Sequence, residues 1–307
     1  MKVLVTGGAG FIGSHVVDRC VEAGHQVAVV DDLSTGRRDN VQPAARLHVV
    51  DIRRPALADV FRDEAPEAVI HLAAQAAVSR SVTDPQVDAE VNVLGSINLL
   101  ECCRRSQVRR VVYVSTGGAG YGDTEVVPTP EDHPSRPISP YGVSKVAAEL
   151  YLACWEALYG LSGIVLRLAN IYGPRQNPHG EAGVVAIFTE RLLRGEPCVI
   201  NGDGLQTRDF VYVGDVADAA LLALAKPGAT GAVNIGTGVE TSVVALFESL
   251  RSAAGGRGEA RHGPERPGEQ RRSLLDPSRA RRLLGWSPRV SLDEGLHRTV
   301  ESYGARS

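Results

Sequence analysis

The stretch from Val3 to Gly13 constrains the fold more than any other part of the chain. It reads Val-Leu-Val-Thr-Gly-Gly-Ala-Gly-Phe-Ile-Gly and runs into a segment with helical spacing of its apolar residues, Ile12, Val16, Val17, Cys20 and Val21. This order predicts a strand, a tight turn and a helix. Glycines let the backbone turn sharply, and the free N–H groups of a helix start attract an anion. We therefore expect a phosphate-binding turn formed by Gly7, Gly10, Phe11, Ile12 and Gly13.

An acidic residue follows at the end of the next predicted strand. Residues 27–30 form that strand, which ends at Asp31 and is followed by Asp32. A carboxylate about 20 residues after a glycine turn binds the hydroxyls of an adenosine ribose and repels a 2′-phosphate. The carboxylate of Asp31 therefore favours NAD over NADP. Arg37 and Arg38 in the next loop make this preference moderate. The alternative is a plain tight turn with an acid capping a loop.

Composition excludes several classes of protein. The 307 residues carry a formal net charge of −3, so there is no basic field for nucleic acid. The five cysteines form no C-x-x-C pair and have no histidines at ligand spacing, which argues against a metal site and indicates reduced core residues. No apolar run approaches the roughly 18 residues of a membrane span, and no signal peptide precedes the first strand. We expect a soluble, cytoplasmic protein with no membrane contact.

Strands and helices alternate along the first 170 residues, which predicts a parallel sheet with its ligand crevice at the carboxyl ends of the strands. The expected fold is α/β: a Rossmann-type doubly wound parallel sheet with a smaller C-terminal α/β substrate-binding lobe. We assign residues 1–170 to the NAD-binding domain, with segments near 205–237 returning to it, and residues 171–307 mainly to the lobe. Residues 255–268 are expected to form a loop, and a helix is expected to close at Gly285.

Polar or small residues follow the predicted strands and are expected to line the cofactor. Residues 47–50 form a strand that ends at Asp51 and Ile52, where the carboxylate can accept a hydrogen bond from adenine. The strand over 68–72 ends at Leu72 and is followed by Ala73, Ala74 and Gln75. The two alanines are small enough for the backbone to approach the cofactor closely. A long helix over 84–107 is predicted to pack along Val87, Val91, Leu94, Asn98 and Cys102 and invites a partner helix.

A tyrosine and a lysine supply the expected chemistry. A helix is predicted to start at Pro140, which places Tyr141 and Lys145 one turn apart on the same side. The ammonium and an oxidised nicotinamide would both favour the phenolate, making Tyr141 a general base near neutrality. Thr116 or Ser115, at the end of the strand over 110–114, could bind the substrate hydroxyl. A Tyr-x-x-x-Lys spacing on an ordinary structural helix is the alternative.

Taken together, these motifs resemble the extended short-chain dehydrogenase/reductases, and within them the nucleotide-sugar 4-epimerases of the UDP-glucose 4-epimerase type. The matching residues are Thr6 to Gly13, Asp31, Asp51-Ile52, His71 to Gln75, Asn92-Val93 with Gly95 and Asn98, Tyr141 with Lys145, and Arg208 to Val211. The resemblance implies bound NAD as a catalyst, with Asn92 in its site. It also implies oxidation of the sugar 4-hydroxyl by tyrosinate and hydride transfer, followed by rotation of the 4-keto sugar and reduction on its other face.

The resemblance also implies a substrate site for a UDP-hexose. Asn170 resembles the asparagine that holds the diphosphate, and Arg208 and Arg266 resemble the arginines that bind its charge. Gly183 and Val184 would offer backbone groups to the nucleotide, and Glu269 would bind its ribose. For Arg208, a surface ion pair is the alternative. A homodimer that pairs the helices over 84–107 and 141–159 is also expected.

Departures from the family pattern limit the choice of reaction. Gly117-Gly118 stand where dehydratases and decarboxylases carry acids. Asn201 replaces the aromatic residue that commonly stacks on uracil, and Ser273 is small enough to leave room for an N-acetyl group. The alternatives are an epimerase or reductase of another nucleotide sugar, such as UDP-glucuronate or a dTDP-sugar. Arg80 could bind the carboxylate of UDP-glucuronate. A non-catalytic NAD(H) sensor is a further alternative.

Overall fold

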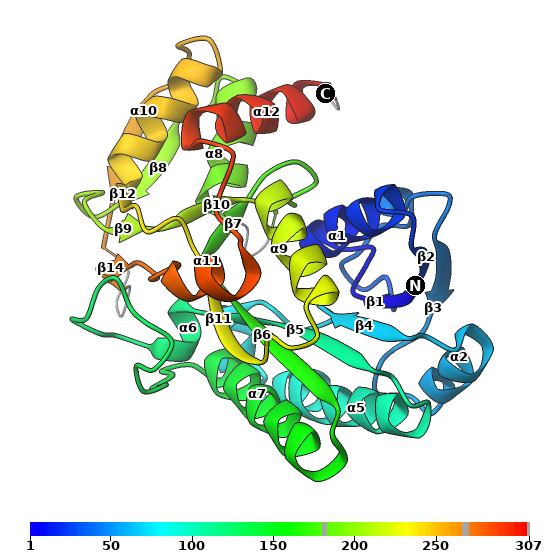
Figure 1. Ribbon diagram of the computed structural model, residues 1–307. Coiled ribbons are helices and arrows are strands. Elements are labelled where there is room, and N and C mark those ends of the chain that lie inside the picture. Colours follow the sequence, from blue (N-terminus) through cyan, green and yellow to red (C-terminus); the bar gives the residue numbers. More distant parts are fainter. Residues whose placement is uncertain (180–182, 266–269, 306–307) are drawn as a thin grey trace.

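The computed structural model describes residues 1–179, 183–265 and 270–305. A seven-stranded parallel sheet forms its centre, in the order β11-β6-β5-β4-β1-β2-β3 (Figure 1). The order reverses at β1 and β4, as in a doubly wound fold. The strands are β1 Lys2–Thr6, β2 Gln26–Asp31, β3 Arg46–Val49, β4 Ala68–His71, β5 Arg110–Thr116, β6 Ser162–Leu168 and β11 Gly231–Ile235. The expected doubly wound parallel sheet is confirmed.

Helices cover both faces of this sheet. On one face α1 Phe11–Glu22 and α9 Val213–Ala225 pack side by side, and α11 Ser278–Leu284 lies next to them. On the other face lie α2 Ala56–Glu64, α5 Gly95–Arg105 and α7 Pro140–Tyr159 (Figure 1). The aliphatic strand residues are almost fully buried on both sides, Val5 and Ile70 among them. This explains why the strands read as continuous apolar runs.

The segment over 84–107 differs from its prediction. It is helical but consists of α4 Pro85–Ala89, a π-helical turn η2 Glu90–Leu94 and α5. Its buried positions include Asp88, Asn92 and Ser96, whereas Leu94 is 59% exposed. The predicted apolar face was therefore wrong in part, because the wider π turn changes the phase of the helix.

The remaining elements form a smaller layer beside the carboxyl ends of the sheet. Its strands are β7 Asn170–Tyr172, β8 Cys198–Asn201, β9 Thr207–Arg208, β10 Phe210–Tyr212, β12 Thr241–Ser242, β13 Ala260–Gly263 and β14 Arg272–Ser273. They pair as β7/β10, β8/β13 and β12/β9/β14. The helices α8 Val184–Leu193, α10 Val243–Ala253 and α12 Leu292–Gly304 pack around them (Figure 1). Phe188 and Phe247 make an edge-to-face contact at 6.0 Å in this core.

Several local predictions can be compared with these elements. Residues 255–268 are not all loop, because β13 pairs with β8 in parallel. Of the 205–237 segment, only β11 joins the large sheet, while β9 and β10 pair elsewhere. The short helices α3 Val78–Thr83 and α6 Gly118–Tyr121 were not predicted. The last turn of α11 does end at Gly285, whose φ of +62° is the left-handed cap expected there.

All five cysteines are free, as expected, but Cys154 is exposed, so they are not all core residues. Within residues 1–179, 183–265 and 270–305, no helix is both long and apolar enough to cross a membrane.

Candidate functional site

The glycine turn between β1 and α1 is built for close backbone approach. Gly7 has a φ of +70°, and a Cβ on Gly13 would lie only 2.0 Å from the carbonyl oxygen of Gly7. Gly10 is the N-cap residue of α1, and it offers no side chain to the first turn. The first N–H groups of α1 therefore remain available to a ligand, and glycine is required where the turn packs on itself. The turn fits a pyrophosphate group.

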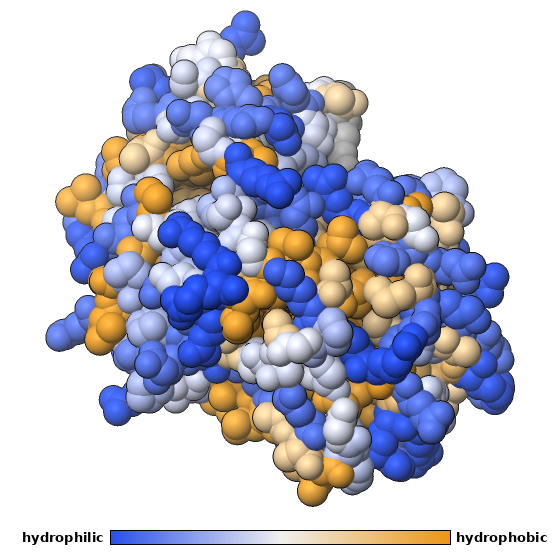
Figure 2. All heavy atoms as spheres, viewed as in Figure 1, coloured by the Kyte–Doolittle hydropathy of each residue, from blue (hydrophilic) through white to orange (hydrophobic). Residues whose placement is uncertain are grey.

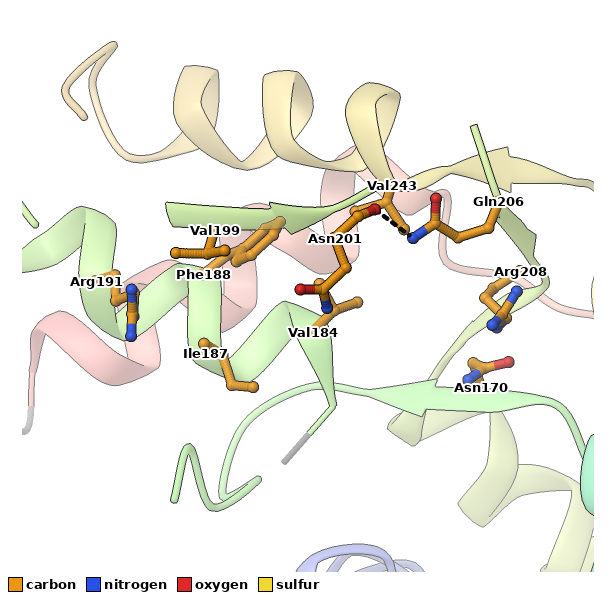
Figure 3. A pocket seen from close by; sticks show the side chains of 10 residues that line it. All are labelled: Asn170, Val184, Ile187, Phe188, Arg191, Val199, Asn201, Gln206, Arg208 and Val243. Atoms are coloured by element: carbon orange, nitrogen blue, oxygen red, sulfur yellow. Dashed lines mark hydrogen bonds between the residues drawn. The ribbon is translucent and has the colours of Figure 1, made fainter. Parts of the chain in front are cut away.

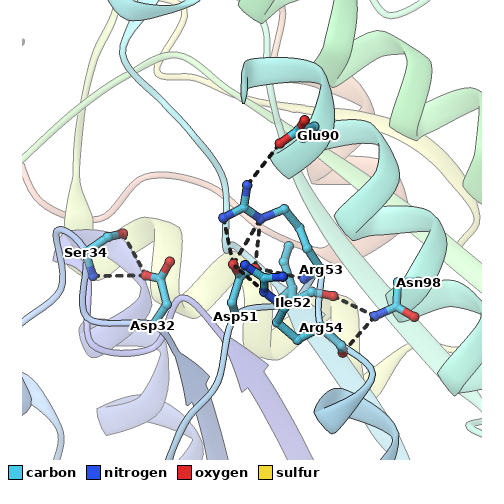
Figure 4. A network of polar contacts seen from close by, with 8 residues as sticks. All are labelled: Asp32, Ser34, Asp51, Ile52, Arg53, Arg54, Glu90 and Asn98. Carbon is cyan, nitrogen blue, oxygen red and sulfur yellow. Dashed lines mark hydrogen bonds and ion pairs between the residues drawn. The ribbon is translucent and has the colours of Figure 1, made fainter. Parts of the chain in front are cut away.

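Asp31 lies beside this turn, at the end of β2. Its carboxylate accepts hydrogen bonds from the backbone N–H of Ala9 and of Leu33, both at 2.9 Å. Burial raises its pKa, and these two hydrogen bonds oppose that effect. The carboxylate is thus tied to the glycine turn and still has lone pairs for a ribose. Asp32 instead accepts from the hydroxyl of Ser34 at 2.6 Å (Figure 4).

Asp51 is part of an ion-pair network at the end of β3 (Figure 4). The Arg53 guanidinium donates to its Oδ2 at 2.7 Å and lowers the pKa of Asp51. The next residue, Ile52, is buried, and its carbonyl accepts from the Asn98 amide at 2.7 Å. Asn98 therefore anchors this strand end to α5. Asn98 thus makes a polar contact, whereas the sequence analysis placed it on an apolar helix face.

A buried amide network holds the loop after β4. The backbone N–H of Gln75 donates to Asn92 Oδ1 at 2.8 Å, and Asn92 Nδ2 donates to the Gln75 carbonyl at 2.9 Å. Asn92 Nδ2 also contacts Ser144 Oγ at 3.0 Å, which links the loop to α7. Ala73 and the glycine turn touch as well, because a Cβ on Gly7 would lie 2.7 Å from the Ala73 nitrogen. Residues 72–75 thus border the glycine turn.

Tyr141 and Lys145 stand at the start of α7, where Ser139 caps the helix. Lys145 is 3% exposed, donates to the Val114 carbonyl at 2.7 Å and lies 4.2 Å from the Tyr113 ring centroid. Burial lowers the pKa of Lys145 to about 7 and raises the pKa of Tyr141 to about 12. The protein environment alone therefore does not make Tyr141 a phenolate at neutral pH. A further positive charge is needed, which an oxidised nicotinamide carries.

The two hydroxyls at the end of β5 differ in what they contact. Ser115 is buried and its hydroxyl donates to Glu149, which also pairs with Arg167. Thr116, the next residue of the strand, points to the opposite face and is partly exposed. Thr116 is therefore the better placed of the two to meet a substrate.

A cavity of about 370 Å³ opens between α8, β8 and the start of β7 (Figure 3). It brings together four of the predicted substrate residues, namely Asn170, Val184, Asn201 and Arg208. Apolar side chains of α8 form one wall, and the Asn201 amide projects into the space, as Figure 3 shows. Gly183 caps α8 directly before Val184. Arg266 and Glu269 lie outside the described residues.

The structure adds residues that the sequence analysis missed. Arg191 and Gln206 line the same cavity, and Gln206 donates to the Asn201 carbonyl at 3.2 Å. Helical spacing from Val184 through Ile187 would have pointed to Arg191, one turn further on. Asp88, 1% exposed, accepts from Gln75 Nε2 at 2.8 Å. Apolar periodicity did not reveal Asp88, because an acidic residue in a helix is expected to lie on the surface.

The fold and these strand-end residues define an α/β protein that binds a dinucleotide at one end of its sheet and a second ligand in the adjoining cavity. The model of the NAD dependent epimerase/dehydratase family matches residues 3–236. The chain belongs to this family.

Several relatives in this family match the chain over its full length. The UDP-glucose 4-epimerase of Mycolicibacterium smegmatis is 48% identical over 315 residues, covering all of both chains. The structure of the Thermotoga maritima UDP-glucose 4-epimerase with UDP-glucose has a TM-score of 0.96 and 49% identity, covering 100% of this chain and 99% of that one. The structure of the Thermus thermophilus UDP-glucose 4-epimerase in complex with NAD has a TM-score of 0.95 and 46% identity, covering both chains fully.

Proposed function

We propose that the protein is an NAD-dependent UDP-hexose 4-epimerase, an isomerase of the UDP-glucose/UDP-galactose type. The observation that carries the proposal is the position of a partly buried Tyr141 and a buried Lys145 together at the start of α7. UDP-glucose 4-epimerases match the chain over its full length. A structural helix would not need to bury a lysine one turn from a partly buried tyrosine.

In this proposal NAD is held by the strand-end residues. The backbone at Gly10 to Gly13 binds the pyrophosphate, Asp31 binds the adenosine ribose, and residues 72–75 with Asn92 border the nicotinamide half. Asp51 and Ile52 lie at the adenine end, with Asp32 next to Asp31. A 2′-phosphate would meet the Asp31 carboxylate, which favours NAD over NADP.

The chain's own groups then handle the proton. Bound NAD supplies the hydride acceptor and donor for C4 of the sugar. Tyr141 takes the proton of the 4-hydroxyl and later returns it, while Thr116 holds the same hydroxyl. Lys145 donates to the Val114 carbonyl, and in its protonated form it places a positive charge one helical turn from the tyrosine. Because Tyr141 both removes and restores the proton, its base strength must suit both directions.

The cavity holds the nucleotide part of the substrate. Arg208 faces the diphosphate together with Asn170, since guanidinium groups bind phosphate through two parallel hydrogen bonds. Val184 and Asn201 contact the nucleoside from the opposite wall. Ser273 lies beside Gly118, whose added Cβ would be 3.1 Å from the serine hydroxyl. A small side chain there leaves room for an N-acetyl group on the sugar.

The test is to incubate the purified protein, without added reductant, with UDP-glucose, UDP-N-acetylglucosamine and UDP-glucuronate, and to separate each from its C4 epimer. We expect the UDP-glucose/UDP-galactose pair to reach equilibrium without net NADH. Tyr141→Phe is expected to abolish turnover while NAD stays bound. Tyr151→Phe, on the exposed side of the same helix, is the matched control and should retain turnover.

Two alternatives remain distinguishable. Conversion of UDP-glucuronate or a dTDP-sugar instead of UDP-glucose would indicate another nucleotide-sugar epimerase or reductase. A sensor that binds NAD(H) without turnover would show unchanged behaviour in Tyr141→Phe. Gly117 and Gly118 lack the acid that dehydration or decarboxylation would require, and this supports simple epimerisation.

We also propose that the protein is a homodimer that works in the cytoplasm. Large apolar side chains lie exposed along α7, with Leu150 67% and Leu158 64% exposed, and Leu94 on the neighbouring helical segment is 59% exposed. Figure 2 shows hydrophobic side chains along the lower edge of the molecule, where α7 lies in Figure 1. Such a stripe suits burial against a second copy. Light scattering should give a dimer mass, and Leu150→Glu should give a monomer. The free thiols agree with a reducing compartment.

A further inference from the structure

The cavity beside α8 extends past the residues assigned to the substrate and ends at Arg191 (Figure 3). Val184, Ile187 and Arg191 recur at helical spacing, so they lie on one face of α8. Arg191 comes seven residues after Val184 and therefore lies about 10 Å further along the helix. Figure 3 shows Arg208 and Asn170 at the opposite end of the cavity. The cavity thus has two polar ends, one at Arg208 and one at Arg191.

The placing of the diphosphate decides which part of a nucleotide meets Arg191. With the diphosphate at Arg208 and Asn170, the nucleoside runs along α8 toward Arg191. In a pyrimidine nucleotide the ribose is joined to N1, and C4 lies directly across the ring from N1. The substituent on C4 therefore points away from the ribose, toward the Arg191 end of the cavity.

The Arg191 guanidinium is held in place and keeps donors for a ligand. Its Nη1 donates to the Pro197 carbonyl at 2.9 Å, which fixes the group at the end of α8. A guanidinium carries five N–H donors, so most of them remain after this contact. The preceding acid, Glu190, pairs with Arg194 at 2.8 Å, and among the described residues no carboxylate forms an ion pair with Arg191.

A guanidinium at this position distinguishes between pyrimidine bases. Uracil and thymine carry a carbonyl oxygen on C4, which accepts hydrogen bonds, whereas cytosine carries an amino group there, which donates them. Arginine has donors only, so it binds the carbonyl and leaves the cytosine amino group facing another donor. The neighbouring walls, formed by Ile187, Phe188 and Val199, offer that amino group no side-chain acceptor. An unpaired polar group in such a site is costly.

We propose that Arg191 is a specificity-determining residue that selects a nucleotide with a carbonyl group on C4 of its pyrimidine base. The inference rests on the proposed function, in which a nucleoside diphosphate sugar fills this cavity. Asn201, whose amide projects into the cavity from β8, has no ring that could stack on the base. Hydrogen bonds at the edge of the base therefore carry more of the selection.

The experiment measures the binding of UDP, dTDP and CDP to the NAD-loaded protein by isothermal titration calorimetry. Arg191→Met removes the donors and keeps an unbranched apolar stem, whereas Arg191→Gln provides an acceptor as well as a donor. Arg194→Met is the matched control, since Arg194 is on the same helix, is 58% exposed and does not line the cavity.

We expect the wild type to bind UDP and dTDP about tenfold or more tightly than CDP, because a hydrogen bond to a charged donor is lost with cytosine. Arg191→Met should weaken UDP and dTDP by the same factor of about ten and CDP much less, so that the preference over CDP approaches one. Arg191→Gln should also bind CDP nearly as well as UDP, and Arg194→Met should bind all three nucleotides as the wild type does.

Equal weakening of all three nucleotides in the Arg191 variants would overturn the inference, because it would show that Arg191 only holds the Pro197 turn. A wild type that binds CDP as tightly as UDP, an unchanged preference in either variant, or failure of both variants to fold would overturn it too. Base-selective binding that depends on Arg191, without epimerisation of any UDP-sugar, would refute the proposed function alone. Epimerisation with an unchanged preference would refute this inference alone.

Discussion

Removal of the charge on Glu149 should destabilise the fold through the buried arginine that it leaves behind. Arg167 and Glu149 are 11% and 7% exposed in their side chains, and they pair at 2.7 Å between Nη2 and Oε2. A second hydrogen bond joins Arg167 Nε to the same oxygen at 3.0 Å. Arg167 also donates to the Tyr121 hydroxyl at 2.9 Å and lies 4.9 Å from that ring centroid.

The magnitude follows from the burial of both partners. Breaking a buried pair at one side costs about 3 to 5 kcal/mol, because the remaining charge is neither solvated nor paired. The Tyr121 contacts stay in Glu149→Gln and hold part of the guanidinium, so we expect the low end, about 3 kcal/mol. The same substitution in an exposed pair, Glu248→Gln beside Arg251, should cost about 0 to 1 kcal/mol; those side chains are 54% and 43% exposed.

Urea unfolding, followed by circular dichroism at fixed NAD concentration, measures this difference. The fixed concentration matters because a ligand that binds only the folded state adds to the apparent stability. A Glu149→Gln loss below about 1 kcal/mol, equal to that of the exposed control, would refute the reasoning. The double variant Glu149→Leu with Arg167→Met should lose less than the sum of the two single changes, since no buried charge is left alone.

Three further outcomes are expected. Gly13→Ala should lower NAD retention and cost about 3 kcal/mol, since its Cβ would meet the Gly7 carbonyl at 2.0 Å, whereas Gly228→Ala, with open space around it, should change neither. Arg208→Leu should raise the KM for the UDP-sugar about tenfold or more with NAD content unchanged, measured by steady-state kinetics. Burial lowers the pKa of His71 from 6.5 to about 3, so the unfolded chain takes up a proton below pH 6.5 that the folded chain does not. The unfolding free energy should therefore fall by about 2 kcal/mol from this residue between pH 7 and 5, and urea titrations of His71→Gln should lack that part.

The sequence predicts the sheet well, because its strands are buried on both faces and end in polar residues at the crevice. Asp31 and Gln75 could be located by that rule, and Tyr141 by its spacing from Lys145 on the helix that starts at Pro140. The buried face of the segment over 84–107 could not be located in full, because Asp88, Asn92 and Ser96 on it are polar. Asp88 and Asn92 are hydrogen-bonded to the loop after β4, and apolar periodicity does not reveal such a contact between distant segments. Pairing of β13 with β8 is likewise a tertiary contact without a local pattern.

The two buried carboxylates near Lys145, Glu149 and Asp88, differ in the partners that hold them. Glu149 is held against Arg167, so its removal leaves a cation without a partner, and the cost should be registered in the free energy of unfolding. Asp88 is held by amides, which remain hydrogen-bonded to an asparagine in its place, so Asp88→Asn should lower the free energy of unfolding less than Glu149→Gln does. Glu149→Gln should also lower the pKa of Lys145, because the Glu149 charge raises it. An equal loss of stability in Asp88→Asn and Glu149→Gln would mean that burial alone, rather than the identity of each partner, governs this region.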